Sequence, residues 1–288
     1  MVDSVLGAWI SLARVIPRGG FPLVRTTAAL FPALRRWPIE LKLVPGVTVQ
    51  GDLRESVWYA LWKYGCYPHQ MGEDLLVSSF LRPGDVAWDV GANIGYTALL
   101  YSYLVGASGT VVAFEPGPKA YGFLQQSTSG VANVETVNLA VSDGPGELWF
   151  MEEHRLDRSA VVPADSPAAT TCVAADSLDS FASRTDGCPA PTFIKIDVEG
   201  HEDSVFRGAA KTIATHRPII EFEALSSDEL KVSKGHLAQF GGGEYTVYQM
   251  THEGKLAESG PTRVTTHTSN FLALTPSHEE RFSKDMFD

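Results

Sequence analysis

The chain has 288 residues and a formal net charge of −11 at pH 7, with 44% hydrophobic and 20% charged residues. This length and composition are typical of a globular protein with one substantial core, and the negative charge argues against nucleic acid as a partner, because phosphate binding needs a basic face. The three cysteines, Cys66, Cys172 and Cys188, lie far apart without CxxC spacing, which argues against a disulfide framework or a cysteine zinc site and favours a cytoplasmic setting.

Residues 1–37 form an apolar segment that carries five arginines and one acidic residue. Proline and paired glycines between Pro17 and Pro22 disfavour a continuous helix, so we expect two short amphipathic helices. These helices could cap a substrate pocket, rest on an anionic membrane surface as a peripheral contact, or pack as an extension or a homodimer contact. The arginines within the apolar part argue against a secretory signal and against a membrane span.

A small β-hairpin is expected next, because two short apolar runs, Ile39–Val44 and Val47–Asp52, flank the turn Pro45-Gly46. Helices are expected over residues 56–64 and 73–80, with Pro83 and Gly84 ending the second. We therefore predict that the chain consists of an N-terminal helical and hairpin extension, residues 1–70, and a main domain, residues 71–288.

From residue 84 onward, apolar runs typical of buried strands alternate with segments typical of helices. Strands are expected at residues 86–90, 110–114, 134–141, 147–151, 170–174, 192–198, 218–223, 245–250 and 270–274, and helices at residues 96–104, 118–127, 178–183, 201–214 and 228–240. This order predicts an α/β fold with a doubly wound, mainly parallel, seven-stranded Rossmann-like sheet and an antiparallel edge strand. The long polar loop at residues 154–169 is a candidate gate for a substrate.

A glycine turn, Asp-Val-Gly-Ala-Asn-Ile-Gly at residues 89–95, follows the first of these strands. Gly91 and Gly95 let a ligand approach the backbone, and Glu115, at the end of the next strand, is placed to accept hydrogen bonds from a ribose diol. Such a unit serves NAD, FAD or S-adenosylmethionine. Asn93 stands where the dinucleotide pattern GxGxxG has the glycine that closes on a pyrophosphate, so the turn favours S-adenosylmethionine.

Four stretches, DVGANIGYTALL, FEPGP, NLAVSD and FIKIDVEGHE, occur in this order and resemble the FkbM-type methyltransferases, a family of class I methyltransferases. The resemblance covers about Gly72 to Glu223. It implies an S-adenosylmethionine-dependent O-methyltransferase that acts on a hydroxyl group of a sugar, a glycolipid or another secondary metabolite, with a small-molecule or lipid-linked acceptor.

The same resemblance implies the residues that bind the methyl donor. Asp89, Gly91, Asn93 and Gly95 would line its methionine and ribose part, Glu115 would hold the ribose hydroxyls, and Ser142 with Asp143 would meet the adenine edge. Asp143 could instead be the first residue of a simple Asp-Gly turn. Glu73 could reach the donor's amino group or only cap its own helix.

Acidic residues gather at the ends of the last two parallel strands. Asp197 and Glu199 alternate with apolar residues after Lys195, and Glu221 and Glu223 share one face of their strand. Several carboxylates are therefore expected to converge beside the donor.

Two mechanisms follow for activating the acceptor. Asp197, Glu221 and Glu223 could bind Mg²⁺, in a position similar to the acidic metal site of catechol O-methyltransferase-like enzymes. Alternatively Asp197 or His201 could act as a general base, with Glu223 as a further catalytic candidate. The less specific interpretations are a structural Lys195–Asp197 ion pair, a His201 that faces solvent, and acids at residues 199 and 202 that only complement a helix dipole.

Two other functions stay open at this point. The acceptor could be an amine or a carboxylate of a small molecule or peptide instead of a hydroxyl. The chain could also be a catalytically inactive binding module of the same fold, although the intact glycine turn, Glu115 and Asp197 argue against loss of the site.

Overall fold

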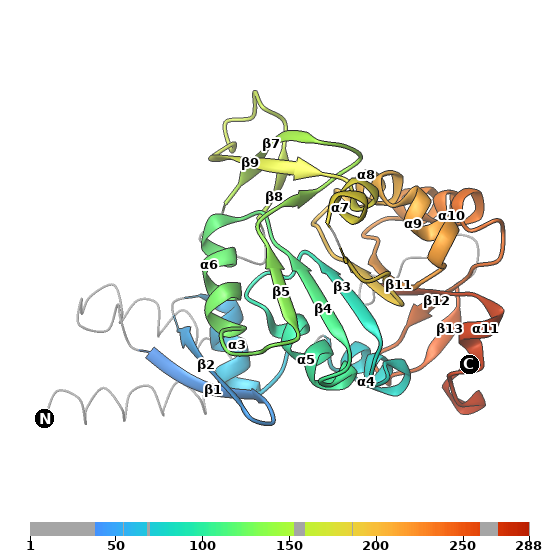
Figure 1. Cartoon of the computed structure of the whole chain (residues 1–288), viewed down its shortest axis with the longest axis horizontal. Coiled ribbons are helices and arrows are strands. Elements are labelled where there is room, and N and C mark those ends of the chain that lie inside the picture. The colour runs from blue at the N-terminus through green and yellow to red at the C-terminus, as the bar shows by residue number, and fades with distance from the viewer. Residues whose placement is uncertain are drawn as a thin grey trace, which may run out of the picture.

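A mixed eight-stranded sheet forms the centre of the computed structural model, which describes residues 38–53, 55–67, 70–152, 159–185, 187–259 and 270–287 (Figure 1). Its strand order is β13-β12-β14-β11-β10-β3-β4-β5. The strands are β3 (Val86–Val90), β4 (Thr110–Phe114), β5 (Val134–Val137), β10 (Phe193–Ile196), β11 (Ile219–Glu223), β12 (Thr246–Met250), β13 (Leu256–Glu258) and β14 (Asn270–Leu274). The expectations for residues 1–37, namely the two helices and their pocket, membrane or dimer contacts, lie outside the described residues.

Five neighbouring strands of this sheet, from β5 to β11, are parallel, whereas β14 pairs antiparallel with both β11 and β12, and β13 pairs antiparallel with β12. The predicted α/β fold with a mainly parallel sheet is confirmed. The expected count of seven strands is one too low, and the antiparallel strand β14 lies inside the sheet and not at its edge. The edge strand β13 is three residues long within a polar connection, so it leaves no hydrophobic pattern to detect.

Helices cover both faces of the sheet, because successive strand residues point to opposite sides. Trp88 and Ile194 pack with one group of helices, and Ala87 and Phe193 pack with the other group. The first group comprises α7 (Leu178–Arg184), α8 (Glu202–Gly208), α9 (Ala210–His216) and α10 (Ser227–Phe240), and the second comprises α4 (Met71–Phe80), α5 (Tyr96–Val105) and α6 (Pro118–Ser127). Among the described residues, no helix is both long enough and apolar enough to cross a bilayer.

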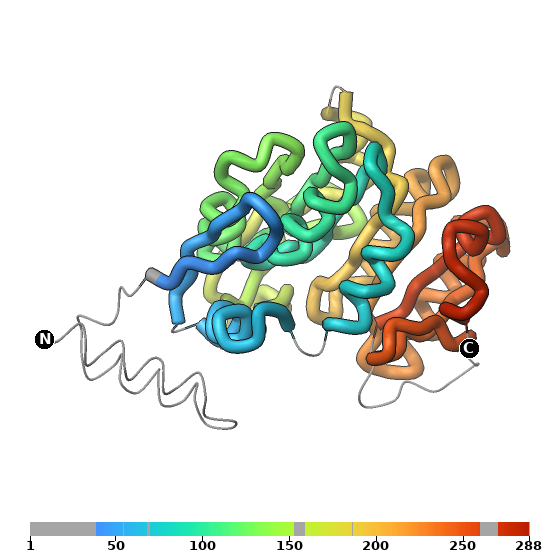
Figure 2. Tube along the Cα trace, turned by 90° about the horizontal axis from the view of Figure 1, so that it is seen from below, coloured from blue at the N-terminus to red at the C-terminus, as the bar shows by residue number. Residues whose placement is uncertain are grey.

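The hairpin β1 (Pro38–Val44) and β2 (Val47–Asp52), with helix α3 (Ser56–Tyr64), packs beside α5 and α6. Their shared core includes Trp58, Leu61, Leu99 and Ala120. Figure 2 shows the hairpin, in blue, at one end of the molecule and the C-terminal segment with α11 (Pro276–Glu279) and the 3₁₀ helix η3 (Lys284–Met286), in red, at the other. The described part of the predicted extension therefore shares a core with the main domain, and a division at residue 70 stays a prediction.

A separate four-stranded sheet has the order β6-β9-β7-β8 and lies above the ends of β5 and β4 in Figure 1. Its strands are β6 (Ala140–Val141), β7 (Gly146–Met151), β8 (Ala160–Val162) and β9 (Thr171–Asp176). The predicted single strand over residues 134–141 is wrong, because the chain leaves the main sheet at Asn138. Its side-chain amide donates hydrogen bonds to the carbonyls of Glu115 and Pro116, at 2.8 and 3.1 Å.

Two further expectations are corrected by this part of the chain. The predicted loop at residues 154–169 contains strand β8, which pairs antiparallel with β7. The predicted helix over residues 201–214 is two helices, α8 and α9, that meet at Ala209.

Candidate active site

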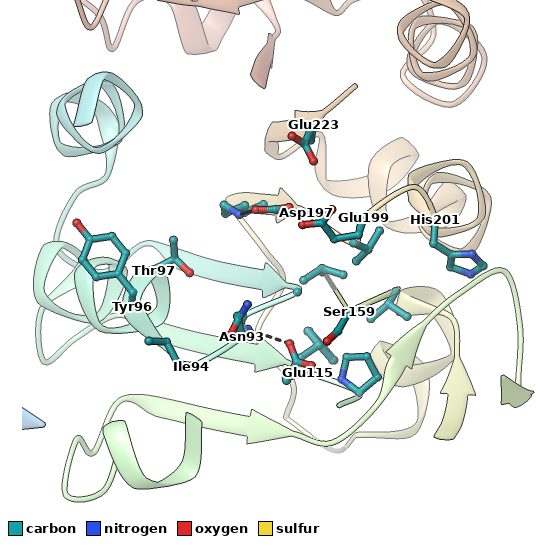
Figure 3. A pocket seen from close by; sticks show the side chains of 18 of the residues that line it. Asn93, Ile94, Tyr96, Thr97, Glu115, Ser159, Asp197, Glu199, His201 and Glu223 are labelled. Carbon is teal, nitrogen blue, oxygen red and sulfur yellow. Dashed lines mark hydrogen bonds and ion pairs between the residues drawn. The ribbon is translucent and has the colours of Figure 1, made fainter. Parts of the chain in front are cut away.

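A cavity of about 500 Å³ lies at the C-terminal ends of the parallel strands, where an open α/β sheet binds its ligands (Figure 3). Its floor comes from the turn after β3, the end of β4 and the segment after β10, which includes Asp197 and His201. Helix α3 lines one wall, and the small sheet lines another through Phe150, Ser159 and Val161. The candidate gate of residues 154–169 therefore reaches the cavity through the two described residues Ser159 and Val161.

The glycine turn is held against its neighbours by its own N–H groups. Gly91 and Ala92 donate to the carbonyl oxygen of Phe114, at 3.0 and 2.9 Å, and Asn93 donates to Glu115 Oε2 at 2.9 Å. Gly91 has a φ of 91°, and a Cβ on it would come within 1.8 Å of the Asp197 carbonyl oxygen, so glycine is required here. Donors that a pyrophosphate would need in this turn are thus already used inside the fold.

Glu115 is buried at the cavity wall, with 6% of its surface exposed. Its Oε1 accepts a hydrogen bond from the Gly117 N–H at 2.8 Å, and its Oε2 accepts the Asn93 bond. Burial raises the pKa of Glu115 to about 7, although both N–H groups act to lower it. A hydroxyl pair that donates to this carboxylate would stabilise its charged form, as predicted for a ribose diol.

Asp89 lies beneath the cavity and does not line it. Its carboxylate accepts a hydrogen bond from the Thr97 hydroxyl at 2.6 Å, and Thr97 does line the cavity. Burial raises the pKa of Asp89, against the opposing influence of Lys195 and Thr97. The Thr97 hydroxyl, which nothing in the sequence pattern singles out, thus links Asp89 to the cavity, and a direct contact between Asp89 and the donor stays a prediction.

Glu73 enters the cavity from the first turn of α4 and accepts a hydrogen bond from the Asn270 side chain at 2.6 Å. Its carboxylate thus contacts β14 and not a backbone N–H of its own helix, so the capping alternative is not observed. Burial raises the pKa of Glu73 to about 7, and burial raises that of its neighbour Asp74 to about 6. Asp74 accepts a hydrogen bond from the Tyr96 hydroxyl at 2.6 Å.

Stability is expected to decrease as the pH rises from about 5 to 7 and then to level off, because Glu73 and Glu115 keep their protons up to about pH 7 in the folded chain, whereas a glutamate of the unfolded chain ionises near about 4.3. The folded chain then binds more protons, so its free energy of unfolding falls with pH. Over the lower part of this range, His201 and His278, whose pKa values burial lowers, act in the opposite direction. Calorimetric melting temperatures measure the effect. The Glu73→Gln variant should show a flatter curve, and a melting temperature that rises over this range would contradict the expectation.

Asp197 and Glu223 both line the cavity, from the ends of β10 and β11. Lys195 Nζ donates to Asp197 Oδ2 at 2.5 Å, so the ion pair that the sequence left open is present. Glu221 is only 2% exposed and does not line the cavity, and burial raises its pKa well above the usual range. The predicted set of Asp197, Glu221 and Glu223 therefore does not come together at the cavity.

The Mg²⁺ prediction gains no support from this arrangement. Among the described residues, no group of three or more His, Cys, Asp or Glu side chains could hold a metal ion. The Asp197 carboxylate, the expected centre of such a site, already binds the Lys195 ammonium.

His201 precedes α8 as its N-cap residue and lines the opposite end of the cavity from Tyr96 and Thr97 (Figure 3). Its Nε2 lies 3.0 Å from Ser142 Oγ, and burial lowers its pKa. His201 is therefore half-buried and held by Ser142 at the cavity.

Ser142 and Asp143 do not line the cavity themselves. Asp143 is exposed and forms an ion pair with Arg207 at 3.2 Å, so its contact with the donor stays a prediction that this placement does not support. Ser142 reaches the cavity only through His201. Leu139, Ala140 and Val141, just before it, line the wall, together with Phe150 of the small sheet.

Comparison with known proteins places this geometry in context. The family model described as "Methyltransferase FkbM domain" matches residues 89–250. The hexuronic acid methyltransferase AglP of Haloferax volcanii is 28% identical over 143 residues, which cover 49% of this chain and 56% of that protein. The chain thus matches little more than half the length of that curated relative.

Two solved structures are similar at low identity. A methyltransferase FkbM from Methylobacillus flagellatus KT is 17% identical, with a TM-score of 0.47 over 90% of this chain and 61% of that one. The fibrillarin of Aeropyrum pernix, solved in complex with S-adenosyl-L-methionine, is 13% identical, with a TM-score of 0.41 over 70% of this chain and 73% of that one.

Proposed function

The chain belongs to the family of FkbM-domain methyltransferases, and from this premise we propose that it is an S-adenosylmethionine-dependent O-methyltransferase acting on a hydroxyl group of a sugar, a glycolipid or another secondary metabolite. The observation that carries the choice of donor is the glycine turn. The N–H groups of residues 91–93 donate hydrogen bonds to Phe114 and Glu115, and the buried carboxylate of Glu115 lies beside the turn. A pyrophosphate bound at the turn would lie near this negative charge and would find the N–H groups already used. The positively charged S-adenosylmethionine would instead be attracted by the carboxylate.

The proposed orientation of the donor follows the order of side chains along the cavity. Glu115 accepts hydrogen bonds from the ribose hydroxyls. The adenine ring packs against the apolar wall that includes Val141 and Phe150, next to His201. Thr97, at the other end of the cavity (Figure 3), contacts the methionine part. Glu73, which also lines the cavity, accepts a hydrogen bond from the amino group. In this orientation His201 contacts the donor and is not the base that acts on the acceptor.

Asp197 is the proposed general base, because it lies in the cavity between these two ends. When bound, S-adenosylmethionine supplies a methyl group on a positively charged sulfur, which keeps the electron pair of the broken carbon–sulfur bond as the acceptor oxygen bonds to the carbon. Asp197 accepts the proton that the hydroxyl loses. Glu223, across the cavity from Glu115, is the second carboxylate available to orient the acceptor.

The relative AglP is named for hexuronic acid, which supports a sugar as the acceptor of this chain too. The alternative acceptor is a carboxylate or an amine, and it is tested separately with uronic acids and amino sugars.

Titration calorimetry with S-adenosylmethionine and with NAD tests the donor, and transfer of a labelled methyl group to neutral sugars, uronic acids and amino sugars tests the acceptor. We expect binding of S-adenosylmethionine only and labelling of a sugar hydroxyl. Tight binding of NAD without S-adenosylmethionine would contradict the proposal, and labelling confined to a carboxylate or an amine would replace the acceptor. Donor binding without transfer to any acceptor would instead support an inactive binding module.

A further inference from the structure

We propose that Lys195 is a positioning residue for methyl transfer, in that its buried ammonium holds and balances the Asp197 carboxylate that takes the proton of the acceptor. The inference rests on the proposed function of the site. Lys195 would then have a role in the reaction beyond that of a partner in a structural ion pair.

Lys195 lies in the middle of the sheet, on β10 between β3 and β11. Its register partners are Asp89 on one side and Glu221 on the other, and in-register residues of parallel strands share one face. All three are buried, with at most 5% of their surface exposed. Lys195 is also the one lysine or arginine among the buried residues that the structure describes.

The Lys195 side chain ends at the cavity, where Nζ donates to Asp197 Oδ2. Asp197 is 28% exposed at its side chain, and its second oxygen, Oδ1, has no hydrogen bond to any described residue. One carboxylate oxygen is therefore fixed by the sheet, and the other is left for a hydroxyl in the cavity.

The backbone of Asp197 is held as closely as its side chain. Its N–H donates to the Val90 carbonyl at 3.0 Å, and its own carbonyl lies against Gly91, where no side chain would fit. With the backbone fixed to β3, the Lys195 contact determines where the carboxylate points. A residue that acts in this way serves catalysis by preorganising the group that reacts.

Lys195 cannot itself be the base, because it keeps its proton. Burial alone would lower the pKa of Lys195, but Asp197, Asp89 and Glu221 raise it above its ordinary value. Its charge also offsets the acids around it, because Glu73 and Asp74 of α4 face the same cluster. Without this cation, the Asp197 carboxylate would lose the ammonium group that it contacts.

A double-mutant cycle tests whether Lys195 acts through Asp197. We compare Lys195→Met, Asp197→Asn and the double variant for kcat, for donor affinity and for the pH dependence of kcat/KM. Lys195→Met is expected to lower kcat about 100-fold, to leave donor affinity within about threefold, and to move the acidic limb of the pH profile to higher pH. The double variant should be no slower than Asp197→Asn alone, because a residue that acts only through Asp197 has nothing left to position.

Lys211→Met is the matched control, since it makes the same substitution at an exposed lysine of α9, and it should leave all three measurements unchanged. Lys195→Gln is measured in parallel and replaces the methionine variant in the cycle if that variant does not melt cooperatively. Fully additive losses in kcat, or an unshifted pH profile, would overturn the inference while leaving the proposed function intact. A wild-type protein that methylates no acceptor would overturn the proposed function, and the inference with it.

Discussion

Replacing Glu115 by glutamine is expected to weaken S-adenosylmethionine binding about 100-fold, which corresponds to about 2.7 kcal/mol. The carboxylate accepts the N–H groups of Asn93 and Gly117 from within the protein and has the charge that a ribose diol can donate to. A glutamine keeps one acceptor oxygen and turns an NH₂ group toward one of these N–H donors. Titration calorimetry on the variant and on the wild type measures the loss.

Asp143→Asn is the control for this substitution. The resemblance to the FkbM-type methyltransferases assigns both acids to the donor, but Asp143 lies outside the cavity and pairs with Arg207. Its variant should bind the donor within about threefold of the wild type. Equal losses in both variants, or none in Glu115→Gln, would contradict the proposed orientation of the donor.

The raised pKa of Glu115 leads us to expect that the affinity for S-adenosylmethionine depends on pH. Because burial raises its pKa to about 7, the free site is partly protonated at neutral pH and must lose that proton before it can accept both hydroxyls. Affinity should therefore rise between about pH 6 and 8 and then level off. The Glu115→Gln variant, which has no titrating group at this position, should show no such rise.

Replacing Asp197 by asparagine is expected to lower kcat about 1000-fold while donor affinity stays within about threefold. Asparagine preserves the shape of the side chain and its contact with Lys195 but cannot accept the hydroxyl proton. Single-turnover transfer of a labelled methyl group, with donor binding measured separately, distinguishes the two effects. A parallel assay with a metal chelator tests the alternative in which an ion activates the acceptor.

Asp203→Asn is the matched control, because Asp203 is an exposed acid of α8 outside the cavity. It should leave kcat unchanged. An active Asp197→Asn variant would move the role of base to Glu223 or His201. Weaker binding of S-adenosylmethionine with an unchanged kcat would instead indicate that Asp197 binds the donor and not the acceptor.

Most element bounds follow from local pattern alone. The strands Val86–Val90 and Thr110–Phe114 and the helix Pro118–Ser127 are observed with the bounds expected from the sequence. Buried strands of a parallel sheet are continuous apolar runs, and glycine or proline ends them sharply, so these signals are strong. The errors occur where pairing is decided elsewhere, as at Asn138, whose side chain binds the carbonyls of a neighbouring strand end.

The place of the cavity in the fold follows from the sequence for a similar reason. Glu115 and Asp197 each follow an apolar strand, so their position at the ligand edge of the sheet is set by chain order. Thr97 and Asn270 were missed, since a threonine in a helix and an asparagine at a strand start have no spacing that marks them. The family resemblance assigns Asp89 to the cavity and the strand face assigns Glu221 to it, but both are covered beneath it.

The sequence by itself determined the class of fold, the glycine turn with its acidic partner, and the family to which the chain belongs, because each depends on residues that are close in the sequence or on the order of strands. Only the tertiary structure decided which carboxylates face the cavity and which are covered. It also placed Lys195 between Asp89 and Glu221 with its ammonium on Asp197. Burial and cross-strand register set the charge of these groups, and both arise only when distant strands pair.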